Sequence, residues 1–129
     1  MLKGAWNMKI AKITEAEMEI MKIIWEEDNE ITTATILEKL PKENSWKTTT
    51  VMTLITRLIE KGILSVTKIG KLNNYSAKVT EEEYKAVQTD IFLDDMHNGS
   101  IRNFMATLYN SRKISKKDIA DLKNWIKEV

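Results

Sequence analysis

The sequence predicts a mainly helical α+β protein in two parts, and this prediction rests on two observations. First, apolar side chains recur at intervals of three and four residues in six separate stretches of the 129-residue chain, which is the spacing of amphipathic helices. Second, residues 63–79 have the composition of two strands, with glycine and asparagine between them as in a hairpin turn. A single hairpin among helices therefore defines the expected fold class.

The first predicted helix begins at Thr14. Thr14 and Glu17 have the spacing of a capping box, in which each side chain bonds to the backbone of the other residue. Residues 1–11 show no clear period, so we expect a flexible start, with Met8 as an alternative initiator. The apolar residues that share one face of the helix are Met18, Met21, Ile24 and Trp25.

Two further helices follow a polar connector over residues 26–30. Thr32 or Thr33 is expected to cap the second helix, and Pro41 ends it because proline cannot continue a helix. The third helix is predicted to run from Thr48 to Lys61, with Gly62 as the left-handed residue that follows its end. The buried stripe of the second helix consists of Ile36, Leu37 and Leu40, and that of the third of Leu54, Ile55, Leu58 and Ile59.

The strand-like segments follow the third helix directly. Ile63–Ile69 and Tyr75–Val79 are the predicted strands, and Gly70–Asn74 is the predicted turn. Three helices and a hairpin predict a winged helix-turn-helix domain over residues 1–79, in which the third helix and the hairpin contact DNA. The alternative is a small α+β domain with no nucleic-acid role, because a fold does not dictate a function.

Residues 80–129 predict a separate all-helical part. Thr80, Ser100 and Ser115 are each placed to cap a short amphipathic helix. Three such helices cannot bury their apolar faces alone, so they are expected to form a dimerisation domain with the same segment of a second chain. The predicted interface stripe on the last helix consists of Ile119, Leu122 and Ile126, continued by Val129.

Composition narrows the class of protein. Apolar residues make up 43% of the chain and charged residues 30%, with no apolar run as long as a membrane span. There is no cysteine, which excludes disulfides and thiolate metal sites, and the start of the chain lacks the pattern of a signal peptide. We therefore expect a soluble, cytoplasmic protein.

Positive charge is concentrated in the segment that contains the third helix and the hairpin, and hydroxyl groups are concentrated at the start of that helix. The whole chain carries a net charge of +1, but residues 42–78 hold seven bases against two acids, a net charge of +5. Threonine is a mediocre helix former, yet four threonines open the third helix, and their hydroxyls and methyls suit phosphates and base edges. The predicted DNA-binding residues are Thr48, Thr49, Thr50, Met52, Thr53, Arg57, Lys68 and Lys71.

Each of these residues has a simpler interpretation. The threonines could serve only as exposed residues that cap the start of a helix, and Met52 could contact a thymine methyl or belong to the core. Arg57 could form an ion pair within the protein instead of contacting a phosphate. Lys68 and Lys71 would be ordinary surface lysines if the hairpin were not a wing.

No residue pattern indicates catalysis or a cofactor. The sequence has no phosphate-binding glycine loop and no recognisable nucleophile with a base, so an enzyme is not expected. His97 is the single histidine and has no second nitrogen or sulfur ligand nearby, so we expect a solvated loop residue and no metal site. Trp25 and Trp46 are expected to be packing residues.

The sequence resembles the BlaI/MecI-type penicillinase repressors over almost the whole chain from Ile13 onward. The segments that carry the resemblance are Ile13-Thr-Glu-Ala-Glu17 with Met21-Lys-Ile-Ile-Trp25, then Thr50-Val-Met-Thr-Leu-Ile-Thr-Arg-Leu58 with Lys61-Gly62, and Tyr75-Ser in the returning strand. The resemblance implies a homodimeric repressor that binds a palindromic operator. It also implies a membrane sensor metalloprotease, triggered by β-lactam, whose action leads to cleavage of an Asn-Phe bond, here Asn103-Phe104.

This chain departs from the family pattern in two respects. Repressors of the family commonly open the recognition helix with Pro-Lys-Thr and carry arginine where this chain has Met52. A different operator or a lower affinity is therefore expected. The copper-responsive branch carries C-terminal cysteines, which this chain lacks, so copper sensing is not expected. The sequence is also compatible with a winged-helix protein-interaction module, or with a regulator of a different stress regulon that has no β-lactam response.

Overall fold

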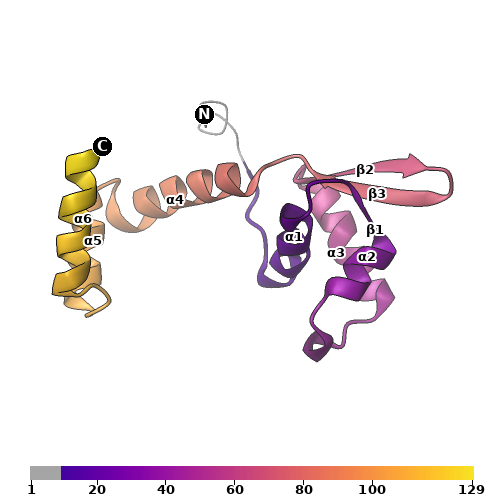
Figure 1. The fold of residues 1–129 in the computed structure, drawn as a ribbon, viewed down its shortest axis with the longest axis horizontal. Helices are drawn as coiled ribbons and strands as arrows, with labels where there is room; N and C mark the ends of the chain where they lie inside the picture. Colours follow the sequence, from indigo (N-terminus) through magenta and orange to yellow (C-terminus); the bar gives the residue numbers. More distant parts are fainter. Residues whose placement is uncertain (1–9) are drawn as a thin grey trace. The chain divides into compact units, whose positions relative to one another are not determined.

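The computed structural model describes residues 10–129, so residues 1–9, part of the expected flexible start with its alternative initiator, lie outside the described residues. The chain forms two compact units, which we describe separately; the first ends at Gln88 and the second comprises Thr89–Val129 (Figure 1). Among residues 10–129, no helix has the length and apolar character needed to cross a bilayer.

The first unit contains three helices, a three-stranded sheet and the start of a fourth helix. The expected caps of the first two helices are present: Thr14 and Glu17 form the capping box, and Thr32 accepts a hydrogen bond from the backbone of Thr35. In chain order the elements are α1 (Glu15–Glu26), β1 (Ile31–Thr32), α2 (Thr33–Lys39), a 3-10 turn (Lys42–Asn44), α3 (Thr48–Glu60), β2 (Leu64–Ile69), β3 (Leu72–Ala77) and α4 (Glu81–His97).

The sheet is antiparallel, with strand order β1-β3-β2. Strand β1 was not predicted; it pairs Ile31 with Tyr75 of β3 and adds a third, edge strand to the hairpin. The predicted turn over residues 70–74 was wrong, because Gly70 and Lys71 alone reverse the chain and Asn73 pairs with Lys68 in the ladder. Gly70 adopts φ 63°, and a two-residue turn with such a glycine needs no further residues.

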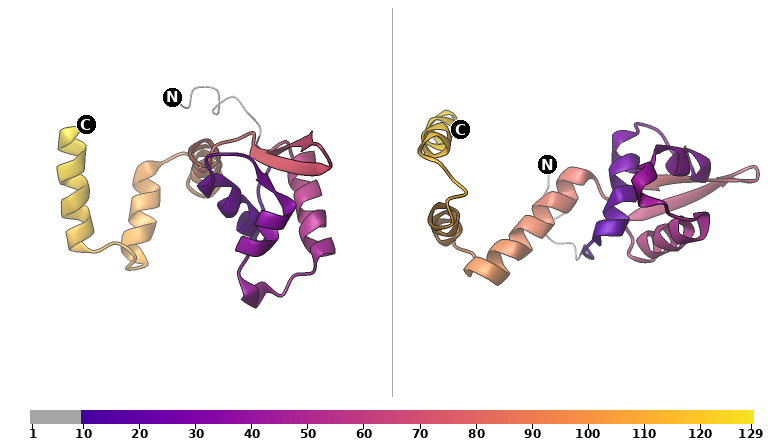
Figure 2. Two further views of the ribbon diagram at one scale, coloured as in Figure 1. Left: turned by 45° about the vertical axis from the view of Figure 1, so that its right-hand side comes forward. Right: turned by 90° about the horizontal axis from the view of Figure 1, so that it is seen from below.

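The core of the first unit lies between α1, α2, α3 and the base of the hairpin (Figure 2). Each helix contributes its predicted apolar stripe because apolar side chains at helical spacing share one face. Tyr75 of β3 is 1% exposed at the centre of the sheet. Fully buried side chains include Ile20, Met21, Ile36, Val51, Ile55, Leu58, Ile63 and Leu64.

The start of α4 belongs to this core. Tyr84 and Val87 are buried, and the Tyr84 hydroxyl accepts a 2.8 Å hydrogen bond from the backbone N–H of Ile13. Gln88 Nε2 donates to the carbonyl of Ile10 at 3.1 Å. The compact unit therefore continues past the expected domain boundary at residue 79.

The second unit consists of the rest of α4, α5 (Ile101–Asn110) and α6 (Lys116–Glu128). Ser100 and Ser115 cap α5 and α6 as expected, since each side chain accepts a hydrogen bond from the backbone three residues on. No apolar side chain within residues 89–129 is buried. The buried residue of this unit is His97, which is 8% exposed, so the prediction of a solvated loop histidine was wrong.

Candidate nucleic-acid interface

Helix α3 presents the predicted hydroxyl-bearing face to solvent. Thr48, Thr49, Thr50, Thr53 and Arg57 are exposed, whereas the opposite face packs into the core through Val51, Leu54, Ile55 and Leu58. The N-cap residue of α3 is Lys47, which makes no side-chain capping bond. Thr48, Thr49 and Thr50 therefore occupy the first turn of the helix instead of capping it, where their exposed side chains lie at the positive end of the helix dipole.

The hydroxyl orientations limit what this face can recognise. Thr53 Oγ1 donates to the carbonyl of Thr49 at 2.9 Å, and Thr56 Oγ1 donates to that of Met52 at 2.9 Å. Because each hydroxyl proton is used within the helix, these oxygens can only accept a hydrogen bond from DNA, and each shares its side chain with a methyl group. Such groups suit the amino groups of adenine and cytosine or the methyl group of thymine.

Thr56 is a candidate that the sequence reasoning missed. It is exposed and follows Thr53 by three residues and Thr49 by seven, so the three threonines share one face of the helix. The helical spacing of the threonines is sufficient to predict Thr56 as a member of this face.

Met52 and Arg57 differ in their surroundings. Met52 is half-buried and packs against the core cluster, which favours the packing interpretation over a base contact. Arg57 is exposed and forms no ion pair with any of residues 10–129, so its guanidinium is available to a phosphate.

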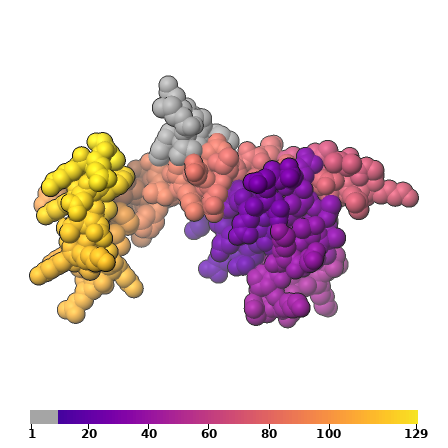
Figure 3. Space-filling view, in the orientation of Figure 1, coloured from indigo at the N-terminus to yellow at the C-terminus, as the bar shows by residue number. Residues whose placement is uncertain are grey.

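The hairpin of β2 and β3 forms the predicted wing and extends beyond the helices of its unit (Figures 2 and 3). Lys68 and Lys71 are exposed on it. Beside them, Ile69 and Leu72 form the cross-strand pair next to the turn and are 59% and 61% exposed. The tip therefore combines positive charge with apolar surface, a combination that fits the sugars and phosphates of a groove edge.

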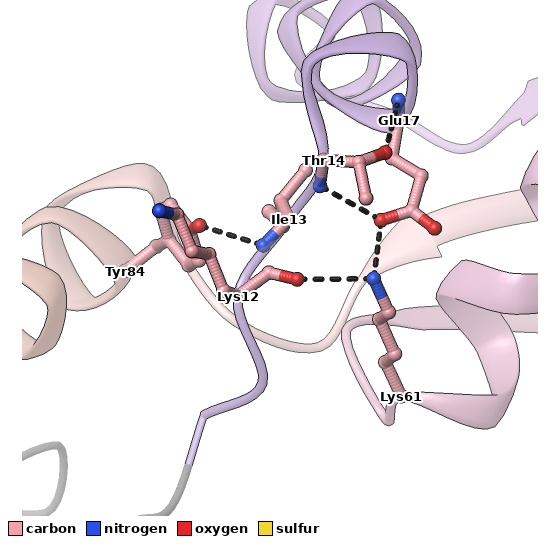
Figure 4. Close-up of polar contacts among 6 residues, drawn as sticks. All are labelled: Lys12, Ile13, Thr14, Glu17, Lys61 and Tyr84. Atoms are coloured by element: carbon pink, nitrogen blue, oxygen red, sulfur yellow. Dashed lines mark hydrogen bonds and ion pairs between the residues drawn. The ribbon is translucent and has the colours of Figure 1, made fainter.

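A partly buried ion pair joins the end of α3 to the start of α1 (Figure 4). Lys61 Nζ lies 2.5 Å from Glu17 Oε1 and donates to the carbonyl of Lys12 at 3.0 Å. Glu17 is 1% exposed, and its Oε1 also accepts from the backbone N–H of Thr14 at 2.9 Å. Burial disfavours the ionised carboxylate, but the hydrogen bonds from Lys61 and Thr14 outweigh it and hold the pKa of Glu17 below its ordinary value.

The backbone at Gly62 fixes how α3 leads into the wing. Gly62 adopts φ 76°, its N–H donates to the carbonyl of Ile59 at 3.0 Å, and the N–H of Ile63 donates to that of Leu58 at 3.1 Å. This pair of bonds is a Schellman motif, which confirms Gly62 as the left-handed residue after the helix. Together with the ion pair, it fixes the direction in which the chain leaves α3 for the wing.

The remaining predicted site residues lie in the second unit. Asn103 and Phe104 are in the first turn of α5, while Ile119 and Leu122 are half-buried on α6 and Ile126 is 59% exposed. Two hollows between α5 and α6 have mainly apolar linings. Within residues 10–129, no three histidine, aspartate or glutamate side chains are grouped so that they could hold a metal ion.

Fold and surface together define the class: a winged-helix protein with an exposed helix and a basic hairpin of the kind that binds double-stranded DNA. A family model described as "Penicillinase repressor" matches residues 13–128. The chain belongs to the penicillinase repressor family, a family of transcriptional repressors and not of enzymes.

The relatives are similar over most of their length. The chain is 31% identical over 120 residues to the penicillinase repressor of Bacillus licheniformis, covering 93% of both chains. It is 28% identical over 116 residues to the methicillin resistance regulatory protein MecI of Staphylococcus aureus, covering 90% of this chain and 94% of that one.

Two solved structures of BlaI are similar to 59% of this chain. The solution structure of the DNA-binding domain of the repressor BlaI is similar with a TM-score of 0.52 and 37% identity, covering 59% of this chain and 92% of that chain. The Bacillus licheniformis BlaI monomer in complex with the blaP half-operator is similar with a TM-score of 0.51, 37% identity and the same coverage. These likenesses confirm the predicted winged helix-turn-helix fold.

Proposed function

We propose that this chain is a homodimeric repressor, acting in the cytoplasm, that binds a palindromic operator and is inactivated by proteolysis in its second unit. The observation that carries the DNA-binding part is the exposed face of α3, where threonines and Arg57 stand free of the core. In the proposed complex α3 enters the major groove, and the wing lies along the flanking backbone. The half-operator complex of the similar BlaI supports DNA binding by this chain.

Specific and nonspecific contacts are assigned to different residues. Thr49, Thr50, Thr53 and Thr56 would contact base edges, because they lie on the outward face of α3 and carry acceptors and methyl groups. Arg57, Lys68 and Lys71 would neutralise phosphates, which supplies affinity without sequence preference.

Dimerisation through the second unit follows from its lack of a core. Large apolar residues that are exposed there are 42–83% accessible, and no apolar side chain within residues 89–129 is buried. Three packed helices without a buried apolar residue are not expected to be stable alone. A second copy of the same helices would cover this surface symmetrically. The exposed residues are Ile91, Phe92, Met96, Ile101, Tyr109, Trp125, Ile126 and Val129.

Inactivation is assigned to the Asn103–Phe104 bond, with a membrane sensor metalloprotease as the partner that responds to β-lactam. A cut there would separate the first three residues of α5 from the rest of α5 and all of α6. The fragment that keeps α3 would lose the whole of α6, with the predicted stripe of Ile119, Leu122 and Ile126, and half of the exposed apolar residues of the second unit. A monomer then binds one half-site and loses the affinity gained by linking two binding events.

Titration of operator and scrambled DNA at two salt concentrations tests the DNA-binding part. Thr50→Ala or Thr53→Ala should weaken operator binding by about 1–3 kcal/mol and leave binding to scrambled DNA unchanged. Lys71→Ala should weaken both equally and reduce the salt dependence by about one phosphate contact. Operator binding by the threonine variants equal to that of the wild type would refute the base-reading assignment.

The inactivation part is tested in cells that carry the sensor. Mass spectrometry of the repressor after β-lactam treatment should reveal fragments that end at Asn103 and begin at Phe104. Full derepression with an intact chain, or with a cut at another bond, would refute it.

A further inference from the structure

His97 is the most distinctive side chain of the second unit, because it is buried where all its apolar neighbours are at least partly exposed. It is the last residue of α4. Its Nδ1 lies 2.6 Å from Oδ1 of Asn103, and a carboxamide oxygen can only accept, so Nδ1 carries the proton of this hydrogen bond.

The imidazole ring also packs against two phenylalanines. Its centroid lies 5.3 Å from that of Phe104 and 5.4 Å from that of Phe92, and the two phenylalanine rings are 5.9 Å apart with an angle of 84° between their planes. The three rings therefore contact one another in pairs, at distances where aromatic pairs attract. His97 binds both residues that flank the Asn103–Phe104 peptide bond, one by a hydrogen bond and the other by its ring.

A tight turn joins α4 to α5 and holds His97 close to Asn103 and Phe104. Asn98 and Gly99 adopt φ 49° and 73°, which reverses the chain within two residues. The N–H of Gly99 donates to the carbonyl of Leu93 at 3.0 Å, and that of Ser100 donates to the carbonyl of His97 at 2.8 Å. This short, hydrogen-bonded connection places the first turn of α5 against the end of α4.

The peptide bond itself is held inside the helix on both sides. The N–H of Phe104 donates to the carbonyl of Ser100 at 3.1 Å, and the carbonyl of Asn103 accepts from Thr107 Oγ1 at 3.0 Å. A protease binds its substrate in an extended form, so this turn must open before the bond can be cut. Opening must also separate Asn103 and Phe104 from His97.

We propose that His97, through its hydrogen bond to Asn103 and its packing on Phe104, is a latch that keeps the Asn103–Phe104 bond closed to proteolysis. The latch rests on the proposed function for its biological meaning, since it acts on the bond assigned to inactivation. In chemical terms His97 is a positioning residue: it takes no part in hydrolysis and sets how often the substrate segment opens. Cleavage then depends on the fraction of molecules in which α5 has left α4.

The effect of His97 can be measured with a purified protease whose rate of cleavage before Phe104 depends on how often the first turn of α5 opens. Thermolysin cuts on the amino side of phenylalanine, so incubation of the full-length dimer with thermolysin, followed by mass spectrometry, gives the rate at which a fragment beginning at Phe104 appears. When closing is faster than cutting, this rate is proportional to the open population. His97→Ala should raise the rate about tenfold, because one hydrogen bond and two ring contacts are lost.

Two further variants distinguish local opening at His97 from opening of the whole second unit. His97→Phe retains ring packing without the hydrogen bond and should raise the rate about threefold. Ser115→Ala removes the cap of α6, far along the chain from the bond, and should change the Phe104 rate less than twofold. Circular dichroism and sedimentation of each variant verify that it is folded and dimeric at the concentration used.

The thermolysin rates test the latch independently of the proposed cleavage in cells. A Phe104 rate in both His97 variants equal to that of the wild type would overturn the latch, whatever happens in cells. So would an equal rise in Ser115→Ala and His97→Ala, because the whole unit would then open as one. A raised thermolysin rate with no cut at this bond during β-lactam induction would support the latch and refute the assigned cleavage site.

Discussion

Glu17 and Lys61 form an ion pair in which the carboxylate is buried and the ammonium is partly exposed, so removal of either partner should have a different cost. Lys61→Met leaves a carboxylate that is 1% exposed without its cation, and a buried charge that has lost its partner costs about 3–5 kcal/mol. Glu17→Gln retains an acceptor for the Thr14 N–H and leaves an ammonium that is 25% exposed and still donates to the carbonyl of Lys12. That ammonium can reach water, so the cost should be about 1–2 kcal/mol.

The two variants should also differ in their response to pH. The pKa of Glu17 is lowered in the wild type, so its stabilising contribution is present above the unfolded pKa and is lost as pH falls through the folded pKa. Glu17→Gln does not show that loss. The difference in free energy of unfolding between the wild type and this variant should therefore become smaller as pH falls below the ordinary pKa of glutamate. In Lys61→Met the pKa of Glu17 should be higher than in the wild type, because the hydrogen bond and charge of Lys61 are lost while burial, which raises this pKa, remains. The rise of stability with pH that Glu17 contributes in the wild type should therefore be reduced in this variant.

Urea unfolding at fixed protein concentration, at neutral pH and at about pH 4.5, measures both effects. Trp25 and Trp46 lie in the first unit and pack against its core, so their fluorescence follows the relevant transition. The expected result is a larger loss for Lys61→Met at neutral pH, and a rise of stability with pH that is steeper in the wild type than in Glu17→Gln, where residue 17 no longer titrates. Equal losses at neutral pH, or a Glu17→Gln variant that keeps the wild-type slope, would refute the assignment of Glu17 as a carboxylate that needs Lys61.

Three further predictions concern the backbone, the core and the dimer. Gly62→Ala should cost about 1–2 kcal/mol of stability by thermal unfolding, because φ is 76° while no atom lies within 4 Å of the added methyl group, and Gly62→Asn should cost less. Tyr84→Phe should cost about 1–3 kcal/mol by urea unfolding, since it leaves the buried N–H of Ile13 without an acceptor; a neutral result would mean that water replaces the hydroxyl. Leu122→Asp or Ile126→Asp should give a monomer in sedimentation and weaken operator binding with α3 untouched, whereas a persistent dimer would place the interface elsewhere.

Local chemistry explains which features could be predicted from the sequence. The capping boxes of α1 and α6 join residues three apart, so Thr14 with Glu17 and Ser115 with Asp118 carry the whole signal in a short string. The left-handed Gly62 likewise follows from its place after an apolar stripe. The exposed face of α3 follows from helical spacing, although Thr56 was overlooked there.

Features that depend on distant segments could not be predicted. The capping box accounts for Glu17 in the sequence, and nothing there indicates that Glu17 also forms an ion pair. Its partner, Lys61, is 44 positions away. Strand β1 has two residues, too few to show alternation, and exists because β3 offers an edge beside it. His97 looked like a loop residue because its partners become visible only when α5 folds back along α4.

The two units differ in how they are stabilised, and this difference bears on the proposed inactivation. The first unit has its own core, closed by Tyr84 and Val87 at the start of α4. The second has no buried apolar side chain within residues 89–129 and depends on a partner in the proposed dimer. A cut at Asn103–Phe104 would therefore remove surface from the unit that needs a second chain, while every residue that packs around α3 stays in place. Repression would end because two half-sites are no longer linked, with the winged helix still folded.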